Sequence, residues 1–281
     1  MEKLDKNIKY LVIGNPIHHS KSPAMQNAVF EYYNLGRPYG RLLLEKEELS
    51  EFTDFMRENI CGCNVTVPFK EAIIPFLDEV DPLARQSKSV NTIINRAGKL
   101  YGCSTDGFGL ENSLRENFGF DFKNKSIIFI GVGGAAQALV WHFASLGVKK
   151  FYLVNRSIDK TEALASEIKK VFPQIEIETF ILADEEKLSA AIRSGELLIQ
   201  ATSLGLKATD LPPFKLELLF ENRKIKVADL IYHDTPFLNF AQANNFASIN
   251  GKDMLVYQGA KSFELWTELK APIEVMKKAL D

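Results

Sequence analysis

The segment from Ser126 to Val154 constrains the fold more than any other part of the sequence. Ser126-Ile-Ile-Phe-Ile130 is a continuous apolar run, which predicts a buried strand. Gly131-Val-Gly-Gly-Ala135 then forms a glycine turn, residues 136–146 a helix, and residues 151–154 a second strand. A strand, a glycine turn, a helix and a strand in this order predict a βαβ unit with parallel strands.

The glycine turn also has the chemistry of a dinucleotide-binding loop. In such a loop the glycines let the backbone turn tightly and approach a pyrophosphate, while the helix N-terminus supplies amide donors and a positive dipole. A tight turn with only a structural role is the alternative. We expect a cofactor to be held here by five consecutive residues, Gly131, Val132, Gly133, Gly134 and Ala135.

The end of the next strand decides between NAD and NADP. NAD-dependent enzymes place an acidic side chain there, on the ribose 2′-hydroxyl. This chain instead has Asn155, Arg156 and Ser157, with Lys160 one turn later. Arg156 and Lys160 would attract a 2′-phosphate, and a guanidinium can pair with phosphate oxygens in one plane. The sequence therefore predicts NADP, unless both cations are only solvated side chains at a helix start.

The remaining elements predict an α/β protein with two domains, because 281 residues exceed the usual size of one domain. Strands are expected at residues 8–14, 62–67 and 89–95, with helical segments between them, so the first sheet is parallel or mixed. Ser22-Pro23 predicts a helix start with Ser at the N-cap and Pro at N1. A helix from about Thr105 leads into the βαβ unit, and further strands follow in a doubly wound order, at residues 196–201 and 225–231.

The charge balance argues against nucleic-acid and membrane partners. There are 34 basic and 36 acidic side chains, a formal net charge of −2, so no basic surface is expected. The apolar runs are shorter than a membrane span, and the N-terminal MEKLDKNIKY lacks the apolar segment of a signal peptide. We expect a cytoplasmic monomer or homodimer with a small-molecule partner.

The three cysteines, Cys61, Cys63 and Cys103, are expected to be reduced thiols. An odd number of cysteines in a chain without a secretion signal does not suit a disulfide framework. Paired cysteines in structural zinc sites are usually separated by two or more residues, whereas one residue separates Cys61 from Cys63. No bound metal is therefore expected.

Several separated segments resemble the shikimate dehydrogenase family, in that family's order along nearly the whole chain. The most specific are Gly14-Asn-Pro-Ile-His-His-Ser-Lys-Ser-Pro23, Asn64-Val-Thr-Val-Pro-Phe-Lys70 and Asn250-Gly-Lys-Asp-Met-Leu-Val-Tyr-Gln-Gly259. Shorter segments add to them, namely Val90-Asn-Thr92, Ser104-Thr-Asp-Gly107, Asn155-Arg-Ser157 and Ala201-Thr-Ser203. The resemblance implies a reversible, NADPH-dependent reduction of 3-dehydroshikimate to shikimate, a step of aromatic amino-acid biosynthesis.

The resemblance also assigns the domains. A substrate-binding catalytic domain with a mixed sheet is expected over residues 1–104, and a Rossmann NADP-binding domain over residues 105–251. The helices after Lys252 and from Pro272 are expected to return to the first domain, so that residues 252–281 complete it.

Lys70 and Asp106 resemble the family's catalytic pair, with Lys70 protonating the carbonyl oxygen as hydride reaches its carbon. Lys70 falls in the first turn of a predicted helix, where the helix dipole disfavours a cation, so a functional role explains its position better than a structural one. Judged from the residues alone, Asp106 could serve only as an N-cap.

By the same resemblance, Ser20 and Ser22 hold the substrate carboxylate, and two hydroxyls at a helix N-terminus do make a natural anion site. The remaining ligands of the substrate ring are Thr66, Asn91, Tyr232 and Gln258. The positions implied at the nicotinamide are Leu230, through its main chain, Gly251 and Met254. Each of these residues has an ordinary structural role as its alternative.

Some positions depart from the family's pattern. Gln26 stands where many members have His and resembles a quinate/shikimate subgroup, so quinate is an alternative substrate and NAD an alternative cofactor. Ser104 and Gln200 replace Asn, Gln137 replaces an often basic residue near the phosphates, and the loop from Tyr232 to Thr235 is short. A shikimate-sensing regulator is a further alternative, although binding alone would not require a proton donor.

Overall fold

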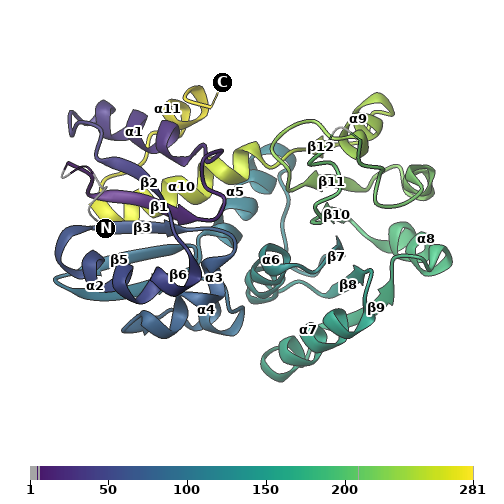
Figure 1. The fold of residues 1–281 in the computed structure, drawn as a ribbon. Coiled ribbons are helices and arrows are strands. Elements are labelled where there is room, and N and C mark those ends of the chain that lie inside the picture. The colour runs from purple at the N-terminus through teal and green to yellow at the C-terminus, as the bar shows by residue number, and fades with distance from the viewer. Residues whose placement is uncertain (1–4, 6, 208, 281) are drawn as a thin grey trace. The chain divides into compact units, whose positions relative to one another are not determined.

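The computed structural model describes residues 5, 7–207 and 209–280, and the chain divides into two compact units (Figure 1). Unit 1 contains the chain up to Gly109 and again from Val256, and unit 2 contains Leu110–Leu255. The divisions fall inside two helices, α5 (Asp106–Phe118) and α10 (Lys252–Thr267). They lie a few residues after the domain boundaries expected from the sequence, which follow residues 104 and 251. A continuous helix has no break at a domain boundary, so each of these two helices contributes residues to both units.

The sheet of unit 1 is mixed, as expected. Its six strands lie in the order β2-β1-β3-β5-β6-β4. They are β1 (Tyr10–Gly14), β2 (Tyr39–Leu43), β3 (Gly62–Val65), β4 (Glu79–Val80), β5 (Thr92–Arg96) and β6 (Lys99–Cys103). β1 pairs parallel to β2 and β3, whereas β5 pairs antiparallel to β3 and β6. β5 alone therefore makes this sheet mixed, because β6 and the short strand β4, which pairs parallel to it, run in the same direction as β3.

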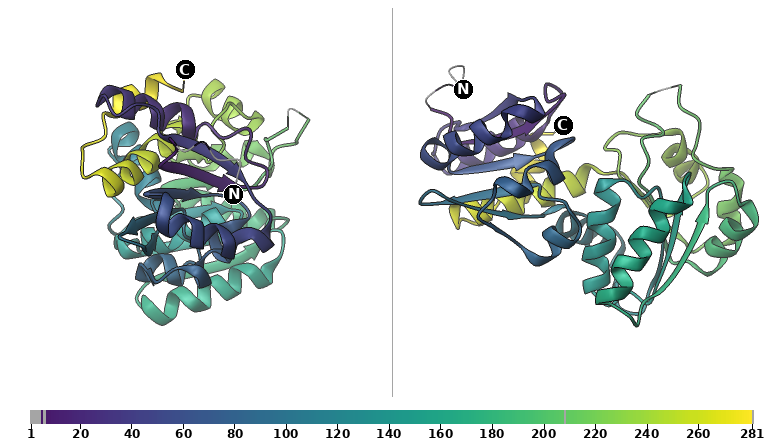
Figure 2. Two further views of the ribbon diagram at one scale, coloured as in Figure 1. Left: turned by 60° about the vertical axis from the view of Figure 1, so that its left-hand side comes forward. Right: turned by 60° about the horizontal axis from the view of Figure 1, so that its bottom comes forward.

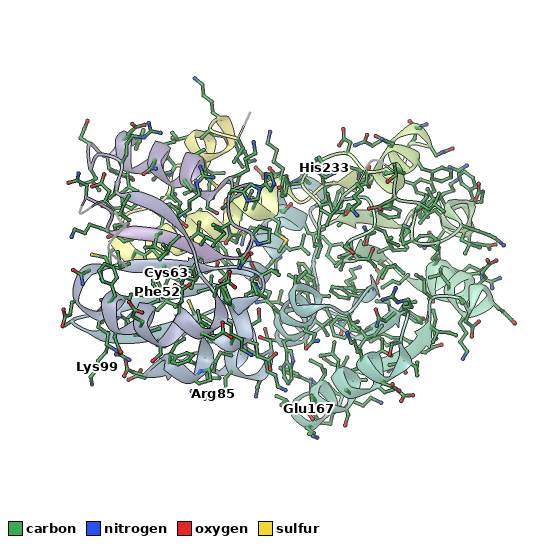
Figure 3. The ribbon with its side chains drawn as sticks, viewed as in Figure 1. Phe52, Cys63, Arg85, Lys99, Glu167 and His233 are labelled. Atoms are coloured by element: carbon green, nitrogen blue, oxygen red, sulfur yellow. The ribbon has the colours of Figure 1, made fainter. Side chains whose placement is uncertain are left out.

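Alternation along β1 gives unit 1 two apolar layers. Leu11 and Ile13 belong to a cluster with residues of α2 (Leu49–Asn59), whereas Val12 belongs to a cluster with α1 (Ser22–Tyr32) and α10. Figure 1 shows α1, α10 and α11 (Ile273–Lys278) together on one face of the sheet. The other face is covered by α2 and by three short helices, α3 (Phe69–Ala72), α4 (Pro82–Gln86) and η2 (Ile74–Phe76), whereas the exposed η1 (Lys46–Glu48) leads into α2. Phe52 and Cys63, labelled in Figure 3, both lie in this second layer.

The sheet of unit 2 is doubly wound, which confirms the predicted fold. Its six parallel strands have the order β12-β11-β10-β7-β8-β9. They are β7 (Ser126–Ile130), β8 (Lys150–Asn155), β9 (Glu176–Ile181), β10 (Leu197–Gln200), β11 (Lys226–Asp229) and β12 (Ser248–Ile249). The order reverses between β7 and β10, and in such sheets the ligand crevice lies beyond the carboxyl ends of the strands at this point.

Helices flank the parallel sheet on both faces (Figure 2). They include α6 (Gly134–Ser145), α7 (Ile158–Val171), α8 (Glu185–Ser194), α9 (Pro236–Ala243) and the 3₁₀ helix η3 (Leu216–Glu221). The strands of this sheet are buried on both faces, since Ile127, Ile128, Phe129 and Ile130 of β7 are all 0% exposed. The continuous apolar run therefore predicted this strand with its observed bounds.

The start of α1 corrects one expectation. The helix begins at Ser22 itself, with Lys21 at the N-cap and Pro23 in the second helical position. Ser22 therefore is not the capping residue, and no side chain caps the helix from Lys21. Instead, the hydroxyl of Ser20 accepts a hydrogen bond from the backbone N–H of Ser22 at 3.3 Å.

Candidate active site

The two residues expected to be catalytic form an ion pair in unit 1. Lys70 Nζ lies 2.6 Å from Asp106 Oδ2, and the two side chains are 20% and 8% exposed. Lys70 is held there because its neighbour Phe69 is anchored in the core and its own carbonyl accepts from the backbone N–H of Val90. A lysine and a nearly buried carboxylate at this distance can hold and release a proton in a fixed position.

Asn91 joins this pair to the next polar group. Its side-chain Nδ2 donates to Asp106 Oδ1 at 2.8 Å and to Gln258 Oε1 at 3.2 Å. Its Oδ1 accepts from the backbone N–H of Thr105 at 2.7 Å. Four of the predicted residues, Lys70, Asn91, Asp106 and Gln258, are thus connected by hydrogen bonds within one unit.

Ser20 and Ser22 lie at the start of α1, as predicted, and their environment includes a buried tyrosine. Tyr39 is 2% exposed, and its hydroxyl donates to Asn64 Oδ1 at 2.7 Å. Burial raises the pKa of Tyr39 well above its usual value, an effect that neighbouring Cys63 increases and the Ser22 side chain opposes. The phenol is therefore neutral and can donate a hydrogen bond at this end of the site.

Tyr39 and Asn64 were missed by the sequence analysis. The sequence did contain a signal for Asn64, because this residue begins the Asn64-Val-Thr-Val-Pro-Phe-Lys70 segment. Tyr39 lies in β2, a strand that was not predicted, so its proximity to Ser22 had no local signal. Thr66, the remaining predicted residue of unit 1, follows β3, and its backbone N–H donates to Ile13 O at 2.9 Å.

In unit 2 a cavity of about 820 Å³ opens at the carboxyl ends of the strands. Six of the predicted cofactor residues line it, which are Gly131, Val132, Gly133, Asn155, Arg156 and Lys160. The other lining residues, to which the sequence analysis gave no cofactor role, lie at or after the ends of β9 and β10 or near η3, and they are Ile181, Leu182, Ala183, Glu185, Ala201, Thr202, Ser203, Leu204, Pro213, Phe214 and Lys215. The cavity therefore lies at the predicted switch point of the sheet.

The glycines fit a dinucleotide at this position. Gly131 has a φ of +94°, and a Cβ there would lie 2.8 Å from Thr202 Cγ2 and 3.1 Å from the backbone of Ala201. A Cβ on Gly133 or Gly134, by contrast, would meet no atom within 4 Å. Open space above the first turn of a helix is what a pyrophosphate needs in order to reach the backbone N–H groups.

Two cations lie at the edge of the cavity. Arg156 and Lys160 are exposed, and neither forms an ion pair within the described part of the chain. The turn that carries Arg156 is closed by Asn155 Nδ2, which donates to Ser157 O at 3.1 Å. Lys215 is paired with Glu185 at 2.8 Å, so the free positive charge is on Arg156 and Lys160.

The remaining predicted residues of unit 2 lie outside the lining of this cavity. Gly251 packs against the main chain after β11, because a Cβ there would lie 2.2 Å from Leu230 O, and its N–H donates to Ile231 O at 2.9 Å. Met254 is half-buried in the first turn of α10, and Tyr232 is 46% exposed. Gly134, Ala135 and Ser157 are also outside the lining, at the starts of α6 and α7.

The loop after β11 is held by a buried carboxylate. Asp229 Oδ2 accepts from Thr235 Oγ1 at 2.7 Å, and Asp229 Oδ1 accepts from the N–H of Ile231 at 3.0 Å. Burial raises the pKa of Asp229, and these hydrogen bonds oppose the shift. His233 (Figure 3) lies in the same loop, with Nε2 3.1 Å from Gly205 O. The short loop is therefore fixed at both ends of the Tyr232 segment.

All three cysteines are free. Within residues 5, 7–207 and 209–280, no cluster of three or more His, Cys, Asp or Glu side chains could hold a metal ion. None of the helices in the same ranges is long and apolar enough to cross a membrane.

Comparison with family models gives three matches along the chain. Residues 12–93 match the shikimate dehydrogenase substrate binding domain, and residues 113–207 match shikimate / quinate 5-dehydrogenase. Residues 251–280 match the shikimate 5′-dehydrogenase C-terminal domain. The three matches follow one another in the order of the motifs described above.

Known proteins resemble the chain over nearly its whole length. The shikimate dehydrogenase (NADP(+)) of Desulforamulus reducens is 38% identical and aligns with 96% of this chain and 93% of its own. A crystal structure of shikimate 5-dehydrogenase from Listeria monocytogenes with shikimate and NAD has a TM-score of 0.91, with 30% identity and coverage of 100% and 99%. The Thermus thermophilus enzyme with NADP(H) and shikimate has a TM-score of 0.84, with 30% identity and coverage of 97% and 98%.

Proposed function

Because the chain belongs to the shikimate dehydrogenase family, we propose that it catalyses the reversible NADPH-dependent reduction of 3-dehydroshikimate to shikimate. The observation that carries this proposal is the Lys70–Asp106 pair, 2.6 Å apart, with Asn91 and Gln258 bonded beside it. A proton donor held by a carboxylate and surrounded by amides suits the interconversion of a ring ketone and a ring hydroxyl. In metabolism this reaction would serve aromatic amino-acid biosynthesis.

Lys70 is assigned as the group that donates a proton to the carbonyl oxygen in reduction and accepts it in oxidation. NADPH, when bound, supplies the hydride. Asp106 holds the ammonium through Oδ2, while Asn91 occupies Oδ1, so the carboxylate has a single orientation. Removing the proton donor should act mainly on the transition state, where negative charge develops on the oxygen.

At the other end of the substrate, Ser20 and Ser22 are assigned to the carboxylate. The buried, neutral Tyr39 hydroxyl lies at the same end of the site as the Ser22 side chain. Thr66, Asn91, Gln258 and Tyr232 are assigned to the ring hydroxyls. In support, Asn91 and Gln258 are buried and already bonded to the catalytic carboxylate or to each other.

NADP is assigned to the cavity of unit 2. The start of α6, with the glycine turn before it, would take the pyrophosphate, and Arg156 with Lys160 would take the 2′-phosphate. Asn155 and Ser157 close the turn between them. Leu230, Gly251 and Met254 are assigned to the nicotinamide, supported by the close packing of Gly251 on Leu230.

The substrate is a small molecule, and this places the protein among metabolic enzymes. We assign it to the cytoplasm, as a monomer or homodimer that binds neither nucleic acid nor membrane. The net charge of −2 and the three free cysteines support this assignment.

The test is one spectrophotometric assay at the NADPH absorbance, crossing shikimate and quinate with NADP and NAD. The proposal expects shikimate with NADP to give the highest kcat/KM of the four combinations. A higher kcat/KM with quinate than with shikimate would assign quinate as the preferred substrate instead. Binding of shikimate without any turnover would favour the sensor alternative.

A further inference from the structure

We infer that two buried hydroxyls, Thr92 and Ser262, act as positioning residues that orient Asn91 toward the Lys70–Asp106 pair. The inference rests on the proposed function of that pair. Thr92 lies on β5 and Ser262 on α10, and both are 0% exposed, so their action has to pass through their neighbours. Neither residue was singled out as a site residue by the sequence.

The direction of the Asn91 amide can be fixed by chemistry. A backbone N–H only donates, and that of Thr105 points at one end of the Asn91 amide from 2.7 Å, so this end is the oxygen. The other end is then Nδ2, which faces three acceptors, Asp106 Oδ1 at 2.8 Å, Thr105 Oγ1 at 3.0 Å and Gln258 Oε1 at 3.2 Å. With the amide reversed, an oxygen would face the Asp106 carboxylate.

Thr92 enforces this direction with its single hydroxyl proton. Its Oγ1 donates to Asn91 Oδ1 at 2.9 Å. Its oxygen accepts from Asn64 Nδ2 at 3.2 Å, and it lies 2.8 Å from Ser262 Oγ and 3.3 Å from Thr105 Oγ1. Ser262 Oγ in turn accepts from Asn64 Nδ2 at 3.0 Å and donates to Gln258 O at 3.0 Å.

The chain of donors begins at Tyr39. Its hydroxyl donates to Asn64 Oδ1, which aims Asn64 Nδ2 at Ser262 and Thr92. One series of donors therefore runs from Tyr39 through Asn64, Thr92 and Asn91 to Asp106, while Ser262 donates to Gln258 O. Removing the Thr92 hydroxyl would take one acceptor from Asn64 Nδ2 and one donor from Asn91 Oδ1, so the Thr105 N–H would hold the Asn91 amide with less support and its position would become less fixed.

The first experiment compares four variants of the full chain, which are Thr92→Val, Thr92→Ser, Ser262→Ala and Thr53→Val. Thr53 is the matched control, because it is also buried in unit 1 but its hydroxyl donates to Ser50 O at 2.9 Å, outside the chain of donors. For each variant, kcat and KM for shikimate, Kd for NADP and the thermal midpoint are measured.

Thr92→Val should lower kcat about 10- to 100-fold, the effect expected of a misplaced catalytic group, while Thr92→Ser stays within about threefold of wild type. Ser262→Ala should lower kcat about 3- to 10-fold, and Thr53→Val should leave it unchanged. The Kd for NADP should not change in any variant. Equal kcat in Thr92→Val and wild type would overturn the inference, as would equal losses in Thr92→Val and Thr92→Ser. If Thr92→Val does not fold, Ser262→Ala provides the test, and a kcat equal to that of wild type in Ser262→Ala would overturn the inference.

The second experiment tests whether Thr92 acts through Asn91. In an Asn91→Ala background, Thr92→Val should cause no further loss of kcat, because the group that it positions is absent. The same loss in both backgrounds would show that Thr92 acts by another route. A wild-type protein that does not oxidise shikimate would instead overturn the proposed function, and the inference with it.

Discussion

Replacing Lys70 separates its proposed chemical role from its structural role. In Lys70→Ala, Asp106 stays buried with the Asn91 hydrogen bond but loses the 2.6 Å bond from the ammonium. A hydrogen bond to a charged group is worth about 1.5–3 kcal/mol, so the free energy of unfolding should fall by that amount. Independently, loss of the general acid should lower kcat about 10²–10⁴-fold, or roughly 3–5 kcal/mol of barrier.

Lys70→Arg distinguishes the two effects. A guanidinium can pair with Asp106 and restore stability, but it does not release a proton near neutral pH, so the rate should remain low. The assay is single-turnover hydride transfer, followed by NADPH absorbance, in folded protein that binds both ligands. Lys125→Ala is the control, because it removes another lysine–carboxylate ion pair outside the site. In that pair Lys125 Nζ lies 2.7 Å from Glu196 Oε1. Hydride transfer at the wild-type rate in either Lys70 variant would refute the assignment.

Three further predictions concern the cofactor, the carboxylate and the thiols. Arg156→Ala should raise the KM for NADP far more than that for NAD, and equal use of both cofactors by wild type would show that Arg156 is misassigned. Changing Ser20 and Ser22 together to Ala should weaken shikimate binding by about 2–4 kcal/mol with the Kd for NADP unchanged, and calorimetry measures both. Burial raises the pKa of Cys103 to about 12 and that of Cys63 further, so few of their thiols ionise at pH 8, whereas Cys61 is exposed. A thiol reagent should therefore show one fast phase, absent in Cys61→Ser, and three equally fast thiols would contradict this.

The sequence predicted those parts of the fold that have a local signal. The apolar run of β7 and the glycines after it define strand, turn and helix by themselves, and the structure has them there. In contrast, β2 and β9 were not predicted, because burial in β2 alternates and β9 is only partly buried, so neither forms a continuous apolar run. Their pairing partners, β1 and β8, are remote in sequence.

The candidate site shows the same limit. Lys70, Asn91 and Asp106 were identified through short motifs, and the structure brings them together. Tyr39 and Ser262 have no motif of their own, and they become significant only because folding places their hydroxyls against Asn64. The start of α1 was placed wrongly because a Ser before Pro is typical of an N-cap. In the structure Ser22 is the first helical residue, and its backbone N–H donates to the hydroxyl of Ser20.

The discontinuity of unit 1 has a consequence for the newly made chain. Gln258 and Ser262 lie on α10, and the apolar layer under β1 includes Phe263 and Met276. A ribosome that has added only residue 255 has therefore synthesised every residue of unit 2, while the first unit still exposes Val12 and Phe30 to solvent or to a chaperone. A chain that ended at residue 255 would therefore contain every residue that lines the cavity of unit 2 but would lack Gln258 and Ser262 of unit 1.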